Sequence, residues 1–353
     1  MIDIAQRCGA WLRCICAPRR ALSIKLAANI PARAAGIITA GVLALHAPAL
    51  HAQSYPNKPV RLVIPFAPGG TTDIVARFIG DKLGRELGQP VIIENRAGGG
   101  GTIGADFVAK AAPDGYVLGM ATVSTLATNP AMNPKMPYDA TRDFVPVINL
   151  VNVPNVMTVN PVNAPVKDMK EFIALLKRNP GKYSYGSGGA GSISHLDVEL
   201  FKVLTGTFLV HIPYRGSGPA TNDVIAGQVI GQIDNLPSSL PHIKGGRVKA
   251  LAVMADQRVE GLPDVPTFAE VGLKEANNMA WYGLLAPAGT PRDVTEKIRS
   301  AAIRTLADAD TKKRLTDSGA IIDGGSSEAF AQKIAREQKL RVDIVRKQKL
   351  TLE

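Results

Sequence analysis

Three glycine-rich segments of this 353-residue chain carry the groups best suited to chemistry. They span residues 65–73, 98–104 and 185–195, and each lies between an apolar run and a stretch with helical spacing. Glycine lets the backbone approach a ligand closely, and the start of a helix offers unpaired amide donors with a partial positive charge. The arrangement therefore predicts binding of an anion.

The first two segments also have other interpretations. Residues 65–73 fit a tight turn in which Thr71 or Thr72 caps the following helix, with Asp73 in its first turn. Residues 99–104 match the GxGxxG pattern of dinucleotide-binding proteins, but they do not follow the first strand directly. In addition, no acidic residue ends the next strand to bind a ribose hydroxyl. We therefore expect no nucleotide and no other cofactor.

The third segment raises the question of a hydrolase, because it contains Ser187, Ser192 and His195. Ser187 is out of register with the GxSxG motif, and His195 is placed to pack or to cap a helix start. The segment also lacks the Lys-Ser/Thr end of a phosphate-binding loop. Beyond residue 52 the remaining histidines, His211 and His242, show no HExxH or other paired spacing, so no metal site is expected.

A fourth turn, residues 212–219, contains Arg215 between a strand and a helix. A guanidinium group can form two parallel hydrogen bonds to a carboxylate. The alternative is an arginine on the surface of a turn, and the sequence does not separate the two.

Strands and helices alternate along most of the chain, which predicts parallel sheets with helices on both faces. The first half is expected to hold strands at 60–64, 91–93 and 116–121 and helices at 71–87 and 102–111. The second half is expected to hold helices at 169–178, 193–204 and 220–226 and strands at 182–185, 208–212, 229–233 and 248–253. A last strand at 281–286 precedes helices at 295–307, 310–318 and 327–347.

Two similar halves predict two α/β domains with a cleft between them. We expect residues 53–153 and 278–353 to form the first domain and residues 154–277 to form the second. The chain is expected to cross between them within residues 150–160 and 276–287. Open sheets of this kind bind ligands at the carboxyl ends of their strands, where the glycine-rich segments lie.

The first 52 residues have the pattern of a cleaved secretory signal peptide. They hold six basic residues and one acidic residue, followed by the uncharged stretch 34–50 and by Ala52. The uncharged stretch is too short for a membrane-spanning helix and contains Pro48. We therefore expect export and cleavage after Ala52. All three cysteines lie in this leader, so no disulfide or thiolate chemistry is expected in the exported protein.

The charge of the chain is +11, of which about +6 remains after the leader is removed. The basic residues are scattered except in the last helical stretch, where no aromatic residue follows Phe330. Nucleic-acid binders concentrate positive charge on one face and often interleave aromatic side chains. We therefore expect no nucleic-acid partner, and a mild positive field favours anionic ligands.

Residues 55 to about 349 resemble the substrate-binding proteins of tripartite tricarboxylate transporters, the Bug or TctC family. The resemblance is carried by motifs in order along the chain: Tyr55-Pro-x-Lys-Pro59, Pro65-Phe-Ala-Pro-Gly-Gly70, Glu94-Asn-Arg96 with Gly100-Gly-Thr-Ile-Gly-Ala105, Pro113-Asp-Gly-Tyr116, Tyr185-Gly-Ser187 with His195-Leu196, Pro213-Tyr-Arg-Gly-Ser-Gly-Pro-Ala220, Pro263-Asp-Val-Pro-Thr267, and Trp281 to Pro291. The resemblance implies an α/β fold of two lobes, of the type II-like or Venus-flytrap kind, that closes on a ligand.

In this family, loops on opposite lobes hold a ligand carboxylate, largely through backbone amides and water. By position, the resemblance implies ligand-binding residues on both lobes: Phe66, Ala67, Gly70, Thr71 and Asp73 on one, and Ser187, Gly188, Ser192, His195, Tyr214, Arg215, Ala220 and Asp234 on the other. The chain departs from the family at Ile230, where an acid is common, and at 96–99, where a proline is usual. These departures leave the identity of the ligand open.

The resemblance implies a periplasmic solute-binding protein and not an enzyme. The expected ligand is a small organic carboxylate: a di- or tricarboxylate, an acidic amino acid or an aromatic acid. The expected partners are the membrane permease subunits of a tripartite transporter, and the protein is expected to be a monomer. A ligand sensor that presents its solute to a receptor is the first alternative, and a serine–histidine hydrolase is the second.

Overall fold

The computed structural model describes residues 55–352. The described residues belong to one compact unit. The predicted signal peptide at 1–52 lies outside the described residues. In the part of the chain that is described, no helix is both long and apolar enough to cross a membrane.

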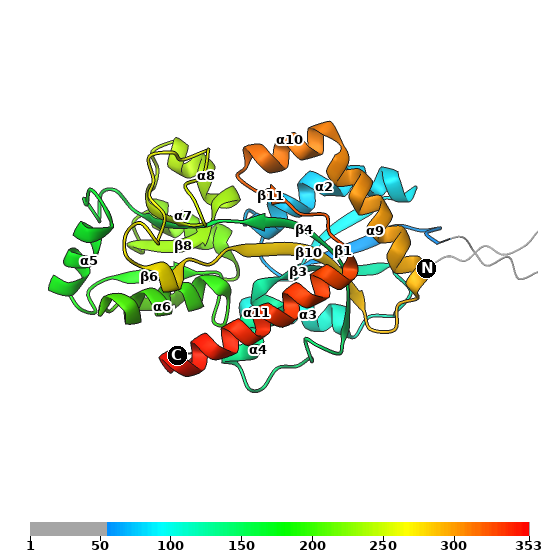
Figure 1. Cartoon of the computed structure of the whole chain (residues 1–353), viewed down its shortest axis with the longest axis horizontal. Helices are drawn as coiled ribbons and strands as arrows, with labels where there is room; N and C mark the ends of the chain where they lie inside the picture. Colours follow the sequence, from blue (N-terminus) through cyan, green and yellow to red (C-terminus); the bar gives the residue numbers. More distant parts are fainter. Residues whose placement is uncertain (1–54, 353) are drawn as a thin grey trace, which may run out of the picture. The chain divides into compact units, whose positions relative to one another are not determined.

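Six strands form the first sheet, in the order β11-β4-β10-β3-β1-β2 (Figure 1). Their bounds are β1 Val60–Ile64, β2 Val91–Asn95, β3 Val117–Thr122, β4 Phe144–Val153, β10 Ala280–Pro287 and β11 Ile321–Ile322. The strands β2 and β3 lie parallel to β1, whereas β10 is antiparallel to both β3 and β4. We call this sheet with its helices the first lobe.

Helices cover the first sheet on both faces, as Figure 1 shows. The helices are α2 Thr71–Leu87, α3 Thr102–Ala109, α4 Asn129–Met132, α9 Arg292–Ala307, α10 Ala309–Asp317 and α11 Ser327–Gln348. The helix α2 packs against α9 and α10, while α3 and α11 contact the strands β3, β10 and β4. Short irregular turns at Gly99–Gly101 and Ser124–Thr128 precede α3 and α4.

The helix α2 illustrates how the sequence sets these elements. Its buried side chains include Val75, Ile79 and Leu83, which recur at helical spacing and face the sheet. It ends at Gly88, whose left-handed backbone (φ 77°) lets its amide reach the carbonyls of Gly84 and Arg85. The buried, β-branched strand β1 runs directly into the loop that precedes α2, and so places the start of this helix at the carboxyl end of the sheet.

Five strands form the second sheet, in the order β7-β6-β8-β5-β9. Their bounds are β5 Asn155–Val159, β6 Ser184–Ser187, β7 Val210–Pro213, β8 Gly231–Asn235 and β9 Lys249–Met254. The helices of this region are α5 Met169–Arg178, α6 Ile193–Thr205, α7 Ser217–Ile225 and α8 Leu236–Lys244. We call this sheet with its helices the second lobe.

The prediction of purely parallel sheets is wrong, because both sheets are mixed. The strand β5 is antiparallel to β8 and β9, just as β10 is antiparallel to its neighbours. The cause is the double crossing of the chain, which leaves the first sheet at Pro154 and returns to it with Ala280. A strand that re-enters a sheet from the far lobe inserts against the direction of the existing strands. These crossings lie within the predicted segments 150–160 and 276–287, and the limits of the two domains stay a prediction.

Several elements differ from the sequence-based expectation. The helix predicted at 220–226 begins earlier, at Ser217. For helix α8 only His242 was placed on a helix and no bounds were predicted, because Pro237 and Pro241 lower the helical propensity, although Pro237 falls in the first turn where proline is tolerated. The prediction also lacked β4, β5 and β11, since residues 150–160 were interpreted as a crossing segment and only helices were expected after the strand at 281–286.

Candidate functional site

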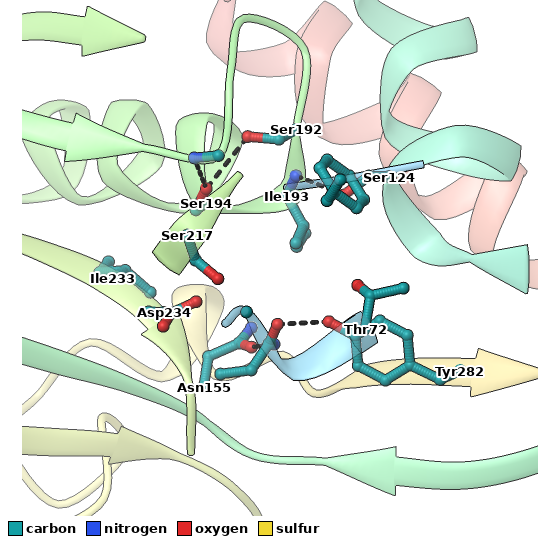
Figure 2. Close-up of a pocket in the computed structure, with 14 residues that line it drawn as sticks. Thr72, Ser124, Asn155, Ser192, Ile193, Ser194, Ser217, Ile233, Asp234 and Tyr282 are labelled. Carbon is teal, nitrogen blue, oxygen red and sulfur yellow. Dashed lines mark hydrogen bonds between the residues drawn. The ribbon is translucent and has the colours of Figure 1, made fainter. Parts of the chain in front are cut away.

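A cavity of about 30 Å³ lies between the two lobes (Figure 2). Residues of both lobes line it: Phe66, Gly70, Thr72, Ser124 and Tyr282 from the first, and Asn155, Gly188, Ser192, Ile193, Ser194, Ser217, Ile233, Asp234 and Asn235 from the second. A buried water molecule needs about 10–15 Å³ of such space. The cavity in this conformation therefore has room for about two or three water molecules, and a four-carbon acid needs the walls to stand further apart.

Four helices of at least nine residues begin at the wall of this cavity. Gly70 and Thr72 belong to the start of α2, Ser192 to that of α6, Ser217 to that of α7 and Asn235 to that of α8. Helix starts carry a partial positive charge and can offer unpaired amides. At α8 only the charge is available, because the amides of Leu236 and Ser238 are bonded to Pro154 and Thr71 and residue 237 is a proline. Within the described residues, the lining contains no lysine, arginine or histidine. The attraction for an anion at this cavity therefore comes from helix ends and hydroxyl groups.

The loop of residues 65–73 is braced from behind by Asp73. The carboxylate of Asp73 accepts hydrogen bonds from the Gly69 amide (3.2 Å), from Arg77 Nε (2.9 Å) and from Asn95 Nδ2 (3.0 Å). Burial raises the pKa of Asp73, but the hydrogen bonds from Arg77, Asn95 and Gly69 outweigh it and hold this pKa below its ordinary value. Asp73 thus stays ionised and fixes the loop, while it does not line the cavity.

The predicted capping of α2 by Thr71 or Thr72 is wrong. The N-cap residue is Gly70, and no side chain accepts a hydrogen bond from the first amides of α2. The Thr71 hydroxyl instead donates to Ser238 Oγ of α8 (2.9 Å) and accepts from the Ser238 amide (3.1 Å). This choice leaves the amides at the start of α2 available on the cavity side, and it links the two lobes.

The loop of residues 185–195 uses most of its amides internally. Gly188 donates to Ser194 Oγ (2.9 Å), Gly189 to Ser187 Oγ (3.1 Å) and Gly191 to His195 Nδ1 (3.2 Å). Only hydroxyl groups and a few backbone atoms of this loop therefore remain for a ligand. Figure 2 shows Ser192 and Ser194 bonded to each other along one wall.

The serine and histidine side chains of this loop do not form a hydrolytic arrangement. Ser187 Oγ contacts His211 Nε2 (2.5 Å) and not His195, and neither Ser187 nor His195 lines the cavity. The two histidine rings stack with centroids 4.0 Å apart. Burial, followed by the charge of Lys202, lowers the pKa of His195 to about 4, and burial with the neighbouring His195 lowers the pKa of His211 to about 4. Both rings are neutral at pH 7 and serve as packing groups.

The GxGxxG segment brings the two lobes into contact. A Cβ atom at Gly100 would lie 2.2 Å from the carbonyl oxygen of Ala190, and one at Gly101 would lie 2.9 Å from the ring of Phe66. These glycines let residues 99–101 pass close to the loop of residues 185–195 and behind Phe66. These glycines therefore have a packing role.

Asp234 is the one acidic residue on the cavity wall in the described chain. Its Oδ2 atom accepts hydrogen bonds from Ser238 Oγ (2.6 Å) and Ser239 Oγ (3.3 Å). Burial raises the pKa of this carboxyl above its ordinary value, although hydrogen bonds from its neighbours oppose the rise. The family resemblance implied this residue, and the cavity contains it.

A second chain of hydrogen bonds starts at Tyr282 and leads away from the cavity. The Tyr282 hydroxyl donates to Asn235 Oδ1, and Asn235 Nδ2 donates to Asn155 Oδ1. Asn155 Nδ2 then donates to Asp197 Oδ2 (3.0 Å) in the buried interior. This chain fixes three polar side chains at the crossing between the lobes, so they form a rigid floor for the cavity.

Of the thirteen residues implied by the resemblance, five line the cavity: Phe66, Gly70, Gly188, Ser192 and Asp234. The other eight lie around it. Ala67 donates its amide to the carbonyl of Arg215 (2.9 Å), whose side chain is exposed. Tyr214 donates its hydroxyl to Asp223, and Ala220 is buried against Gly186. The roles of Thr71, Asp73, Ser187 and His195 described above are likewise contacts behind the wall.

Nine lining residues were not predicted, and they fall into two groups. Thr72, Ser194, Ser217 and Asn235 lie at helix starts, and a search for polar residues after each strand could have found them. Ser124, Asn155, Ile193, Ile233 and Tyr282 reach the cavity through an irregular turn, the crossing strands or the packing of the lobes. The sequence gives no local signal for this second group.

The chain is similar along most of its length to proteins of a known family. A family model described as the tripartite tricarboxylate transporter family receptor matches residues 75–350. The periplasmic binding protein BugD has a solved structure that is 34% identical, with a TM-score of 0.82, covering 84% of this chain and 99% of that one.

Two further solved structures contain a bound acid. MatC of Rhodopseudomonas palustris, with bound malate, is 36% identical with a TM-score of 0.80, and the match covers 82% of this chain and 100% of the MatC chain. The R. palustris protein Rpa4515, with adipate, is 34% identical with a TM-score of 0.81, and the match covers 84% of this chain and 99% of the Rpa4515 chain.

Proposed function

We propose that this chain, which belongs to the tripartite tricarboxylate transporter receptor family, captures a small organic carboxylate in the cavity between its two lobes. The family and the two-lobed α/β fold predicted from the sequence are confirmed. Both are those of periplasmic solute-binding proteins and not of enzymes. The hydrolase alternative is therefore set aside.

The single observation that carries the proposal is the convergence of four helix starts on a cavity without cationic side chains in the described chain. The partial positive charge of these helix starts suits a carboxylate, and the uncapped start of α2 supplies the amide donors. Phe66, Ile193 and Ile233 supply apolar surface for a short carbon chain. The bound malate of MatC and the bound adipate of Rpa4515 support the same class of ligand for this chain.

Ligand capture follows from closure of the lobes over this cavity. We propose residues 53–153 with 278–353 and residues 154–277 as the two bodies that move. Their contacts beside the cavity are direct: Ala67 to Arg215, Thr71 to Ser238, and the close approach of Gly69 to Gly218. A ligand that binds both walls stabilises the closed state through its contacts there.

The thirteen implied residues then divide by role. Phe66, Gly70, Gly188, Ser192 and Asp234 contact the ligand directly. The remaining residues hold the loops or join the lobes: Ala67, Thr71, Asp73, Ser187, His195, Tyr214, Arg215 and Ala220.

The cellular setting is also part of the proposal. Residues 1–52 act as a cleaved signal that directs the protein to the periplasm, where it delivers its ligand to the permease subunits of a tripartite transporter. A sensor that receives the loaded protein is the alternative partner. The protein acts as a monomer, with no nucleic-acid partner.

The test is the thermal stability of the purified protein in the presence of single acids. The panel contains malate, adipate, citrate, aspartate, glutamate, nicotinate and benzoate. An acid present at about 100 times its dissociation constant adds roughly 2.7 kcal/mol to the unfolding free energy. We expect a clear rise in Tm for at least one acid and none for its amide. A folded protein whose Tm responds to none of these acids contradicts the proposal.

A further inference from the structure

Asp234 places a carboxyl group in the wall of a cavity that otherwise attracts anions, and this limits which ligands can bind. Asp234 is 4% exposed and lies on β8, beside Ser217 and Ile233 in Figure 2. It brings a carboxyl group into a cavity whose helix starts attract carboxylates. A ligand must satisfy both features at once.

Every side chain that contacts this carboxyl offers it a hydrogen. Ser238 and Ser239 donate to Oδ2, and Ser217 also hydrogen-bonds to the carboxyl group. The 2.6 Å distance from Ser238 lies in the range of a hydroxyl bonded to a charged oxygen. The contacts from Ser238 and Ser239 both use Oδ2, and the Asn235 backbone amide is a further donor to the carboxyl group. The neighbouring serine hydroxyl groups thus donate hydrogen bonds, and the Asp234 carboxyl group accepts them.

The donor chain behind Asp234 crosses from one lobe to the other. Thr71 of the first lobe donates to Ser238, which in turn donates to Asp234. Closure of the lobes therefore completes the set of donors on the far side of the carboxylate. The side facing the cavity remains for the ligand.

A second carboxylate of a ligand is a poor partner for this group, because two like charges in a water-poor site repel each other. A hydroxyl or an ammonium group is a good partner, because it donates a hydrogen bond to the carboxylate, and the ammonium group also balances the charge. A site built to bond a ligand's O–H or N–H group rejects the analogue that lacks it, since its own polar group is then left unpaired.

We propose that Asp234 selects organic acids that carry a hydrogen-bond donor, a hydroxyl or an ammonium group, on the carbon chain next to the carboxylate held by the helix starts. This inference rests on the proposed function and narrows its substrate class to hydroxy acids and amino acids. Asp234 is then a specificity residue that touches the ligand.

The experiment is isothermal titration of the purified protein at pH 7.5 with matched acids. One set has four carbons: succinate, malate and aspartate. The other has five carbons: glutarate, 2-hydroxyglutarate and glutamate. Within each set only the group on one carbon changes. In the set that binds, we expect the donor-bearing acid to bind about 10- to 100-fold more tightly than the plain diacid, as for a hydrogen bond to a charged group.

Asp234→Asn removes the charge and keeps the shape of the side chain. We expect it to weaken binding of the donor-bearing acid and to strengthen binding of the plain diacid, so that the preference within the set falls below about threefold. The matched control is Asp264→Asn, which removes the same charge from an exposed position of the second lobe. It should leave the preference unchanged.

The outcomes separate this inference from the proposed function. If plain diacids bind the unaltered protein as tightly as hydroxy and amino acids, the inference is wrong while carboxylate capture stands. If Asp234→Asn weakens all acids of a set by one common factor, Asp234 has a structural role only, and the inference is again overturned. If no acid of either set and none of the wider panel binds, the proposed function fails and the inference fails with it.

Discussion

The two glycine-rich loops on either side of the cavity look alike in sequence but work differently. The loop of residues 65–73 leaves the first amides of α2 without a side-chain cap, and Asp73 braces it from behind. The loop of residues 185–195 gives its amides to its own Ser194, Ser187 and His195. One loop is thus an amide cradle for an anion, and the other is a rigid wall that presents hydroxyl groups. Similar composition does not imply similar use of the backbone.

The largest effect on ligand binding is expected from a substitution that keeps the two lobes apart beside the loop of residues 65–73. At Gly218, in the first turn of α7, a Cβ atom would lie 2.5 Å from the carbonyl oxygen of Pro68. Gly218→Ala should therefore block closure and weaken ligand binding by on the order of 100-fold, as for an overpacked contact. Each lobe should keep its fold, because alanine favours a helix over glycine by about 0.5–1 kcal/mol. Titration of the ligand and a urea melt measure the two effects.

The control for this variant is Gly261→Ala, whose Cβ atom would meet only Leu240, at an ordinary 3.5 Å. It should bind the ligand normally. Unchanged affinity in Gly218→Ala would show that the ligand binds without the contact between α7 and the loop of residues 65–73.

Removing the side chain that supports each loop should affect ligand affinity differently in the two loops. Asp73→Ala leaves the Gly69 amide and Arg77 without their acceptor, so the cradle loosens, and we expect about tenfold weaker binding. Ser187→Ala removes a hydroxyl that lies behind the wall, and we expect less than about threefold change in affinity. Both variants should lower the unfolding free energy by about 1–3 kcal/mol. Equal losses of affinity would contradict the division into cradle and wall.

Lowering the pH should destabilise the loop of residues 185–195 before the loop of residues 65–73. The pKa of His195 is lowered to about 4 from its ordinary 6.5, first by burial. Its contribution to stability is therefore complete above about pH 6.5 and is lost as the pH falls toward 4, because the unfolded chain then binds more protons. Between pH 7 and pH 5 the loss is on the order of 2 kcal/mol. Protonation also removes the acceptor for the Gly191 amide.

The measurement is the unfolding free energy in urea at pH 7 and pH 5. In His195→Gln the difference between the two pH values should shrink by that amount. The pKa of Asp73 is held below its ordinary value, so the cradle keeps its brace over this range. A pH dependence that is identical in the variant would show that His195 does not contribute to it.

Much of the fold follows from local sequence, as the helix α2 and the strand β1 show. Their spacing and the glycine at each turn predict their bounds closely. The direction of β5 and β10 does not follow, because a strand looks the same locally whether its neighbours run parallel or antiparallel to it. The bounds of helix α8 do not follow either, since its two prolines argue against a helix while tertiary packing of Leu236 and Leu240 favours it.

The candidate site was predictable where a motif and a helix start coincide, as at Gly70 and Ser192. It was not predictable at Tyr282 and Asn155, which are far apart in the chain and meet at the crossing of the two lobes. The resemblance to the family pointed to Asp234 as a ligand-binding residue. The structure adds that Asp234 is buried among hydroxyl donors, from which we infer its role in ligand selection.

The most direct test of carboxylate capture compares the unaltered protein with Gly70→Val. A Cβ atom at Gly70 would lie 2.7 Å from Ser217 Oγ, in the mouth of the cradle, and Gly70 has an ordinary backbone conformation (φ −84°). Valine there should fill the space of a carboxylate without unfolding either lobe. We predict that the acid that raises the Tm of the unaltered protein has no effect on the Tm of the folded variant. An equal rise in both proteins would contradict the account, because the acid would then bind without the amides of α2.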